Sequence, residues 1–171
     1  MYYNCGEFGV HVSTGNDIRV VEADAFSVTR FWDERVDRRL MMTSCNLRHV
    51  AAAAFRPLPR LRSLGLADNP GLPRADLLDS VRPVDSLTKL DVSWSSAFRP
   101  TFDLAELFYR ESVVGLRLEE LVAAGNGIRT VSMNMSTAAM VGTLRSLDLT
   151  NNELTSLDSG LSLLRRLEHP R

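Results

Sequence analysis

The stretch Leu144-Arg-Ser-Leu147-Asp-Leu149-Thr-Asn-Asn152-Glu-Leu154-Thr-Ser-Leu157 decides the fold. Its pattern is L-x-x-L-x-L-x-x-N-x-L-x-x-L. Leu147, Asp148 and Leu149 alternate as strand residues do, so the two leucines point to the interior and Asp148 points outward. Asn152 follows where the chain leaves the strand, and a buried asparagine there can bond to backbone groups of its own and neighbouring turns. Leu154 and Leu157 then bring the chain back over the same interior.

The same pattern recurs along most of the chain. Its first positions fall at residues 37, 61, 87, 118, 144 and 167, all leucine except Asp37, so successive units are 24, 26, 31, 26 and 23 residues long. Such a period predicts a solenoid, in which stacked coils share one continuous core. Residues 8–32 contain a worn copy that includes Val10, Val12, Asn16, Ile18 and Val21, with its strand part out of step by one residue.

The run from Cys45 to Pro70, CNLRHVAAAAFRPLPRLRSLGLADNP, resembles the typical class of the leucine-rich repeat family. Units of this class end in a return of the form x-x-x-x-Phe-x-x-Leu, here carried by Phe55 and Leu58. The class is common in animal extracellular proteins such as Toll-like receptor ectodomains, Slit-type guidance proteins and neuronal adhesion receptors. The resemblance implies an α/β fold: a curved solenoid with a parallel sheet on its concave face and irregular or helical returns on its convex face.

The returns differ in their expected structure. The apolar residues of two returns have near-helical spacing and predict helices, namely Leu77, Leu78, Val81 and Val84 in one and Leu104, Leu107 and Phe108 in the other. Residues 1–35 are expected to form a degenerate first repeat and an irregular connection, and residues 36–171 to form the repeats, with the last one truncated.

The ends of the chain carry a further expectation. The sequence has no cysteine-rich cap, membrane span or signalling domain of the kind found in the families it resembles, so we expect a fragment of a longer solenoid. Terminal units of a solenoid need polar caps. Leu164 and Leu167 are therefore expected to meet solvent or a missing neighbour, and the isolated chain is expected to be marginally stable and to self-associate through its uncapped ends.

The turn position of Asn152 predicts a structural ladder along one edge of the coil. Corresponding positions in the other units hold Asn126, Ser95, Asn69 and Cys45. Cysteine is an accepted substitute for asparagine at this point of the motif. Each ladder bond contributes about 0.5–1.5 kcal/mol net, whereas an unpaired buried backbone group costs about 1–3 kcal/mol.

Ligand binding is expected on the outward positions of the strands, because solenoids of this class usually bind with the concave face. The candidate residues are Arg39, Met41, Arg62, Lys89, Asp91, Trp94, Glu120 and Asp148. Trp94 is the sharpest of them, because an exposed tryptophan buries a large area on binding at low entropic cost. The alternative for Trp94 is packing over a neighbouring strand or against the insertion at Phe98. The alternative for the arginines is an ordinary solvated face.

Composition and motifs favour a protein that binds and does not catalyse. The chain has 171 residues, 44% hydrophobic and 24% charged, with a net charge of −1, which gives no reason to expect nucleic acid or an anionic membrane as partner. The longest apolar run, residues 50–55, is too short to span a bilayer. The three histidines have no metal-ligand spacing, and no phosphate-binding loop or Ser/His/Asp group occurs. We therefore expect no enzyme activity, metal or cofactor.

The expected function is that of a protein-binding module, with the ectodomain of a receptor or adhesion protein as the leading setting. Asn134-Met-Ser136 is an N-glycosylation sequon, which supports an extracellular or cell-surface location. Two alternatives stay open: a cytoplasmic leucine-rich repeat scaffold, favoured by the lack of disulfides and of a signal peptide, and the repeat region of a larger enzyme such as a kinase or ligase. The ligand is expected to be a protein or another macromolecule.

Overall fold

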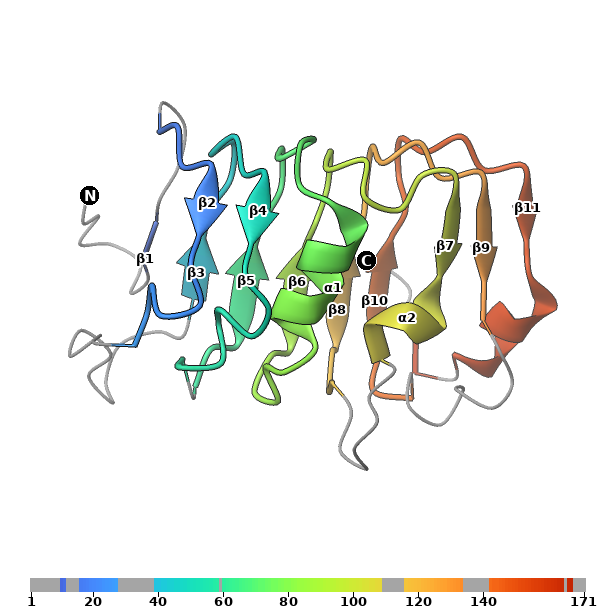
Figure 1. Ribbon diagram of the computed structural model, residues 1–171. Helices are drawn as coiled ribbons and strands as arrows, with labels where there is room; N and C mark the ends of the chain where they lie inside the picture. The colour runs from blue at the N-terminus through green and yellow to red at the C-terminus, as the bar shows by residue number, and fades with distance from the viewer. Residues whose placement is uncertain are drawn as a thin grey trace.

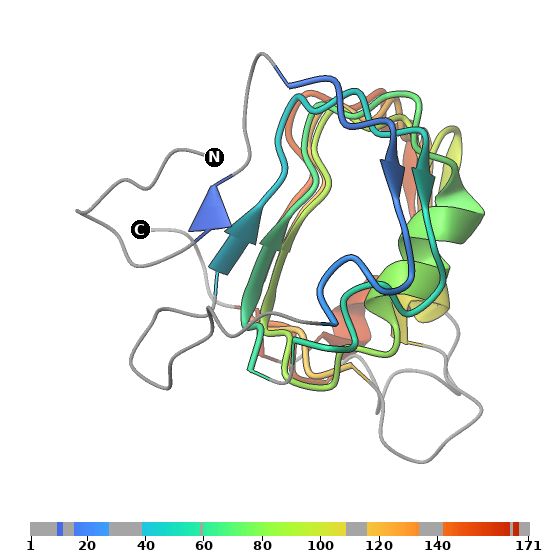
Figure 2. The same ribbon diagram turned by 60° about the vertical axis from the view of Figure 1, so that its left-hand side comes forward.

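The computed structural model describes residues 10–11, 16–27, 39–58, 60–108, 116–133, 142–164 and 166–167. The chain coils so that each turn places a strand beside the corresponding strand of the turn before it (Figure 1). Viewed along the coil, two walls of backbone lie opposite each other and enclose the interior (Figure 2). The architecture is a parallel β-solenoid, and the stacked repeats expected from the period are confirmed.

One wall is a six-stranded parallel sheet, called the long sheet below. Its strands, in spatial order, are β1 (Val10–His11), β3 (Arg39–Met41), β5 (Ser63–Gly65), β6 (Lys89–Asp91), β8 (Glu120–Val122) and β10 (Ser146–Asp148). The register aligns Leu40, Leu64, Leu90, Leu121 and Leu147. These leucines occupy the fourth position of successive units, so the phase of the repeat predicted from the sequence is confirmed.

The worn first copy is also a turn of the solenoid. Val10 pairs with Leu40 in the long sheet, and Val21 of β2 (Val20–Val21) pairs with Val50 of β4 (His49–Val50) on the opposite wall. The first turn therefore has one residue more between its two strands than the second turn. This extra residue accounts for the mismatch in the sequence pattern.

The opposite wall is made mostly of extended returns. Besides β2 and β4 it contains a second group of parallel strands, β7 (Thr101–Asp103), β9 (Thr130–Ser132) and β11 (Ser156–Leu157). The helices are α1 (Arg74–Val81) and α2 (Leu104–Phe108), with a 3-10 helix over Ser159–Leu163. The two helices predicted from apolar spacing are confirmed, but helical returns are the minority among the described residues. The reason is that successive returns pair with one another as parallel strands, which satisfies their backbone groups without a helix.

Helices α1 and α2 are joined by an arginine network. The Nε of Arg74 donates to the Glu106 carboxylate at 2.7 Å, and its Nη1 donates to the carbonyl of Thr101 at 2.9 Å. The Arg74 guanidinium also lies 5.5 Å from the centre of the Phe98 ring. Arg82, just after α1, donates to the backbone carbonyl of Glu106 at 2.8 Å. These contacts connect two turns of the solenoid on the side away from the long sheet (Figure 1).

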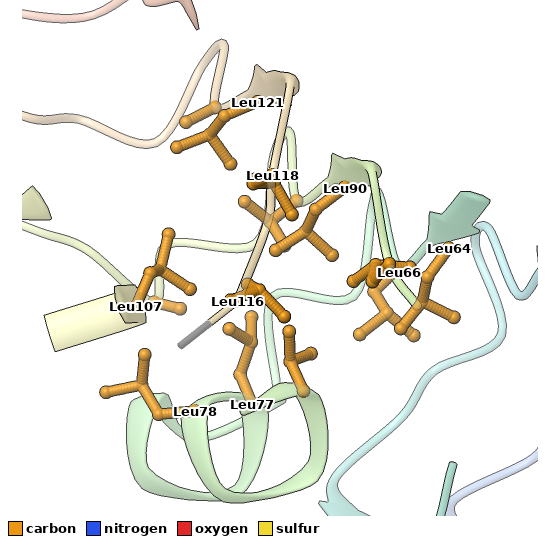
Figure 3. Packing of buried hydrophobic residues seen from close by; sticks show 14 of the residues in the cluster. Leu64, Leu66, Leu77, Leu78, Leu90, Leu107, Leu116, Leu118 and Leu121 are labelled. Carbon is orange, nitrogen blue, oxygen red and sulfur yellow. The ribbon is translucent and has the colours of Figure 1, made fainter. Parts of the chain in front are cut away.

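The interior between the two walls is filled by apolar side chains. Figure 3 shows Leu64, Leu90 and Leu121 from the long sheet directed towards Leu77 of α1 and Leu107 of α2. Four buried phenylalanines add the largest side chains to this core: Phe55, Phe98, Phe102 and Phe108. Phe55 and Leu58 point inward as the motif predicts.

The last described turn departs from the expected burial. Leu154 and Leu157, which the motif places over the core, are 37% and 61% exposed, because β11 pairs with β9 on only one side. Leu164 was expected to meet solvent and is instead buried in the core, where the turn after the 3-10 helix folds it back. Leu167 is exposed as expected, at 40%.

Candidate functional site: the outer face of the long sheet

The outward positions of the long sheet form two rows across the strands. One row, set by the strand register, contains Arg39, Ser63, Lys89, Glu120 and Ser146. The other contains Met41, Gly65, Asp91, Val122 and Asp148. Six of the predicted ligand-binding residues therefore share this face. Arg62 lies just before β5, at the edge where the strands begin, and Trp94 lies in the turn after β6, at the opposite edge.

Most of the charges on this face already have partners within it. The ammonium group of Lys89 lies 2.7 Å from the Glu120 carboxylate on the neighbouring strand. Oδ1 of Asp91 accepts from the N–H and the hydroxyl of Ser93, and Oδ1 of Asp148 accepts from the N–H of Thr150. The two aspartates thus close the turns at the ends of their strands, so their first role is local and structural.

The turns after the strands share an uncommon backbone conformation. Each unit has two inward-pointing apolar residues separated by one residue, such as Leu90 and Val92. The residue two positions after the second of them has a positive φ angle in five successive turns, namely Ser44, Asp68, Trp94, Gly125 and Asn151. Glycine, asparagine and aspartate adopt this left-handed region readily. A tryptophan does so rarely, and Trp94 has a φ of 56°. Holding it there costs about 1–2 kcal/mol relative to glycine.

The ring of Trp94 lies directly against Gly125, the equivalent residue of the next turn. A Cβ atom added to Gly125 would overlap ring atoms of Trp94. The ring therefore packs on the glycine backbone, and 53% of the tryptophan stays exposed. The Trp94 ring thus packs on the turn of the neighbouring unit and is exposed as well, and the predicted binding role stays a prediction. Gly125 supplies the flat support that holds the exposed ring in one position.

Replacing Gly125 with alanine is expected to destabilise the protein by about 2–4 kcal/mol, combining left-handed strain with displacement of the Trp94 ring. Gly127→Ala is the matched control, because Gly127 also has positive φ (69°) but an added Cβ would meet only the flexible side chain of Arg99, at 3.3 Å. We expect the free energy of unfolding of the control variant to fall by about 1–2 kcal/mol. Urea unfolding measures both values. Equal losses would show that the ring does not rest on Gly125.

The predicted ladder residues form a column of buried or half-buried groups. The side-chain oxygen of Asn69 accepts from the backbone N–H of Cys45 (3.1 Å) and of Leu47 (3.0 Å) in the preceding turn, while its nitrogen donates to three carbonyls. Asn152 accepts in the same way from the N–H groups of Asn126 and Ile128. Each asparagine therefore links two turns of backbone at the point where no strand pairing is available.

Asn126 and Ser95 form the middle of this column. Oδ1 of Asn126 accepts from both the N–H and the hydroxyl of Ser95, at 3.2 and 2.9 Å. Its nitrogen donates to the carbonyls of Val92 and Ala124. No buried side-chain polar atom among the described residues lacks a hydrogen-bond partner.

Cys45 occupies the same column with a thiol in place of an amide. It is fully buried, and burial raises the pKa of the thiol above its ordinary value. The thiol donates to the carbonyl of Thr43 at 3.5 Å. A protonated, inaccessible sulfur is a poor nucleophile, so Cys45 acts as a packing group.

A second column of structural residues escaped the sequence analysis. The hydroxyl of Ser86 donates to the carbonyl of Leu61 at 2.8 Å, and the hydroxyl of Thr143 donates to that of Leu118 at 2.7 Å. Both residues stand directly before the first leucine of their unit and reach back one turn. The signal that could have revealed them is a small hydroxyl residue at this position in two separate units.

Other predicted features lie outside the site. Asn134, the sequon residue, falls outside the described residues. Within the described ranges, no group of three or more histidine, cysteine, aspartate or glutamate side chains could hold a metal ion. No helix in those same ranges is long and apolar enough to cross a membrane.

No protein-family model matches the chain, and no curated protein matches it either.

Proposed function

We propose that this chain is a non-catalytic leucine-rich repeat module of the typical class, and that it binds another protein on the outer face of the long sheet. The leucine-rich repeat assignment is supported by the in-register leucines and by asparagines that bond to the backbone of the preceding turn. These are the two features that the repeat motif encodes.

The single observation that carries the binding role is the state of Trp94. It is exposed over half its surface, held in a costly backbone conformation and supported by Gly125. A rigid, exposed tryptophan is the kind of side chain that dominates binding energy at protein interfaces. Strained residues persist where the surrounding structure over-determines them, and they concentrate at functional sites.

A protein partner fits the chemistry beside this tryptophan. The outer face near Trp94 carries the half-buried Val122, and Lys89 and Glu120 are paired with each other there. Such a surface offers little to a small charged ligand. It suits an apolar side chain or a stretch of flat backbone from a partner, with Arg39 and Met41 at the far strand widening the contact area.

For the setting, we propose the ectodomain of a cell-surface receptor or adhesion protein that functions in signalling. The buried Phe55 of the typical-class return and the Asn134 sequon support this setting. A cytoplasmic scaffold is the second candidate, favoured by the presence of only two cysteines in the sequence, since disulfide frameworks are rare in reducing compartments. Coding sequence on both sides of this region separates the two: a signal peptide and clustered cysteines favour the first, and a cytosolic start favours the second. A catalytic domain there would instead make the chain the repeat region of an enzyme.

The experiment that tests the binding role is Trp94→Ala. Proteins captured by the wild-type chain are identified and purified, and their affinities are then measured by calorimetry. We expect the variant to weaken binding of the true partner by about 2–3 kcal/mol, a 30- to 150-fold increase in Kd. Val20→Ala is the control, because Val20 is 47% exposed on the opposite wall. Unchanged affinity in a folded Trp94→Ala protein would remove the long sheet's outer face as the binding surface.

A further inference from the structure

A groove runs along the edge of the long sheet where the strands begin, at the end opposite to Trp94. Its volume is about 470 Å³. The residues that line it come from successive turns and include Arg60, Arg62 and Arg117 together with Asp85 and Glu119; hydroxyl residues make up the remainder. Every side chain that lines it, among the described residues, is polar. A volume of this size lies within the range of small-molecule and oligosaccharide sites.

The repeat itself places arginines in this groove. Arg60 and Arg117 stand directly before the first leucine of their units, and Arg62 stands directly after one. Since neighbouring strands of a sheet lie about 4.8 Å apart, the two units that carry Arg62 and Arg117 are separated by about 10 Å. The guanidinium groups of these two residues have no ion-pair partner within the described part of the chain, and both residues are exposed. They can therefore bind an anion without first breaking a salt bridge.

We propose that this groove binds an acidic oligosaccharide, a sugar chain that carries sulfate groups. Arg62 and Arg117 would each bind one sulfate group through the planar guanidinium fork, which matches oxyanions with two parallel hydrogen bonds. Asp85 and Glu119 would accept hydrogen bonds from sugar hydroxyls between the sulfates. The long axis of the groove runs across the turns, so successive sugar units would lie over successive turns.

The composition of the groove favours a sugar over other polyanions. Single-stranded nucleic acid is bound by stacking its bases on aromatic side chains, and none of the described residues that line the groove is aromatic. A sulfated sugar uses the arginines, the carboxylates and the hydroxyls together.

This site is independent of the protein-binding face. About six residues of strand and turn separate Thr88 in the groove from Trp94, which corresponds to about 20 Å at 3.3 Å per residue. A module with both sites could hold a protein partner at one edge of the sheet and a glycan at the other.

The test is binding of a heparin-derived octasaccharide to the whole chain, measured by calorimetry at physiological ionic strength. We expect the double variant Arg62→Gln/Arg117→Gln to weaken binding about tenfold or more, since each loses a charge-assisted contact. Arg48→Gln/Arg99→Gln is the matched control, because both arginines are exposed, lie beyond the asparagine ladder and change the net charge equally. The control and Trp94→Ala should bind as the wild type does, and circular dichroism verifies that every variant is folded.

Three results would overturn the proposal. The first is no binding of the octasaccharide by the wild-type chain. The second is equal weakening in the two double variants, which would indicate general attraction between a polyanion and any cationic surface. The third is an oligothymidylate of similar charge that binds more tightly than the octasaccharide and loses affinity in the Arg62→Gln/Arg117→Gln variant, which would make the groove a nucleic-acid site. A desulfated octasaccharide should bind at least about tenfold more weakly, because the arginines would lose their anions.

Discussion

Asn126→Leu is expected to lower the free energy of unfolding by about 3–5 kcal/mol, more than the loss of one side-chain hydrogen bond. Asn126 is 1% exposed, and its amide satisfies the N–H of Ser95 and the carbonyls of Val92 and Ala124. Leucine has a similar size but offers neither donor nor acceptor. Each buried backbone group left without a partner costs about 1–3 kcal/mol, and water cannot replace the amide in a closed interior.

The matched comparison for this variant is Asn152→Leu. Asn152 makes the same kinds of bonds, accepting from Asn126 and Ile128 and donating to Ala123 and Leu149, but it is only partly buried. Water can reach some of the backbone groups that Asn152→Leu leaves without a partner, so we expect the free energy of unfolding to fall by only about 1–2 kcal/mol. Chemical unfolding of the two variants measures the difference. A melting temperature unchanged by Asn126→Leu would remove Asn126 from the ladder.

The second large effect is expected for Leu90→Ala, which should lower the free energy of unfolding by about 3–4 kcal/mol. Leu90 is fully buried on β6, between Leu64 and Leu121 of the neighbouring strands. Removing its side chain takes away apolar contacts and leaves a cavity that neighbouring turns, stacked on both sides, cannot collapse to fill.

Leu157→Ala serves as the control for the core. This leucine occupies a late position of the repeat motif but is 61% exposed, so its truncation should cost less than about 0.5 kcal/mol. Urea denaturation monitored by circular dichroism gives both values. If the two leucines cost the same, the turns would not share one continuous interior, and the assignment of inner and outer faces would be wrong.

The phase of the repeat was predictable because it depends on local sequence. A strand residue that points inward in one unit recurs at the same position in the next, so spacing alone identified Leu64, Leu90 and Leu121 as neighbours. The helices at α1 and α2 were predictable for the same reason, since their apolar residues repeat at helical spacing. The ladder positions followed from the motif, although the particular bonds did not.

Other features depended on contacts between turns, which no single unit encodes. The ring of Trp94 rests on Gly125, which lies one unit further along; packing over a neighbouring strand or against the insertion at Phe98 was weighed from the sequence, but this glycine was not identified as the support. The extended returns arose because β7, β9 and β11 pair with each other, a choice that apolar spacing within one return cannot reveal. The burial of Leu164 and the exposure of Leu154 likewise depend on which turn covers which.

The sequence by itself determined that the chain winds into turns with leucines inside, because a hydrophobic period of about 25 residues can be buried only by stacking copies of the unit. The tertiary structure alone decided which surface residues of different units lie beside one another. Arg62 and Arg117 line one groove from units about 10 Å apart, and the Trp94 ring rests on Gly125 of the next unit, only because the turns stack. Surface sites of a solenoid are built from residues of different turns, so they exist only once the coil has formed.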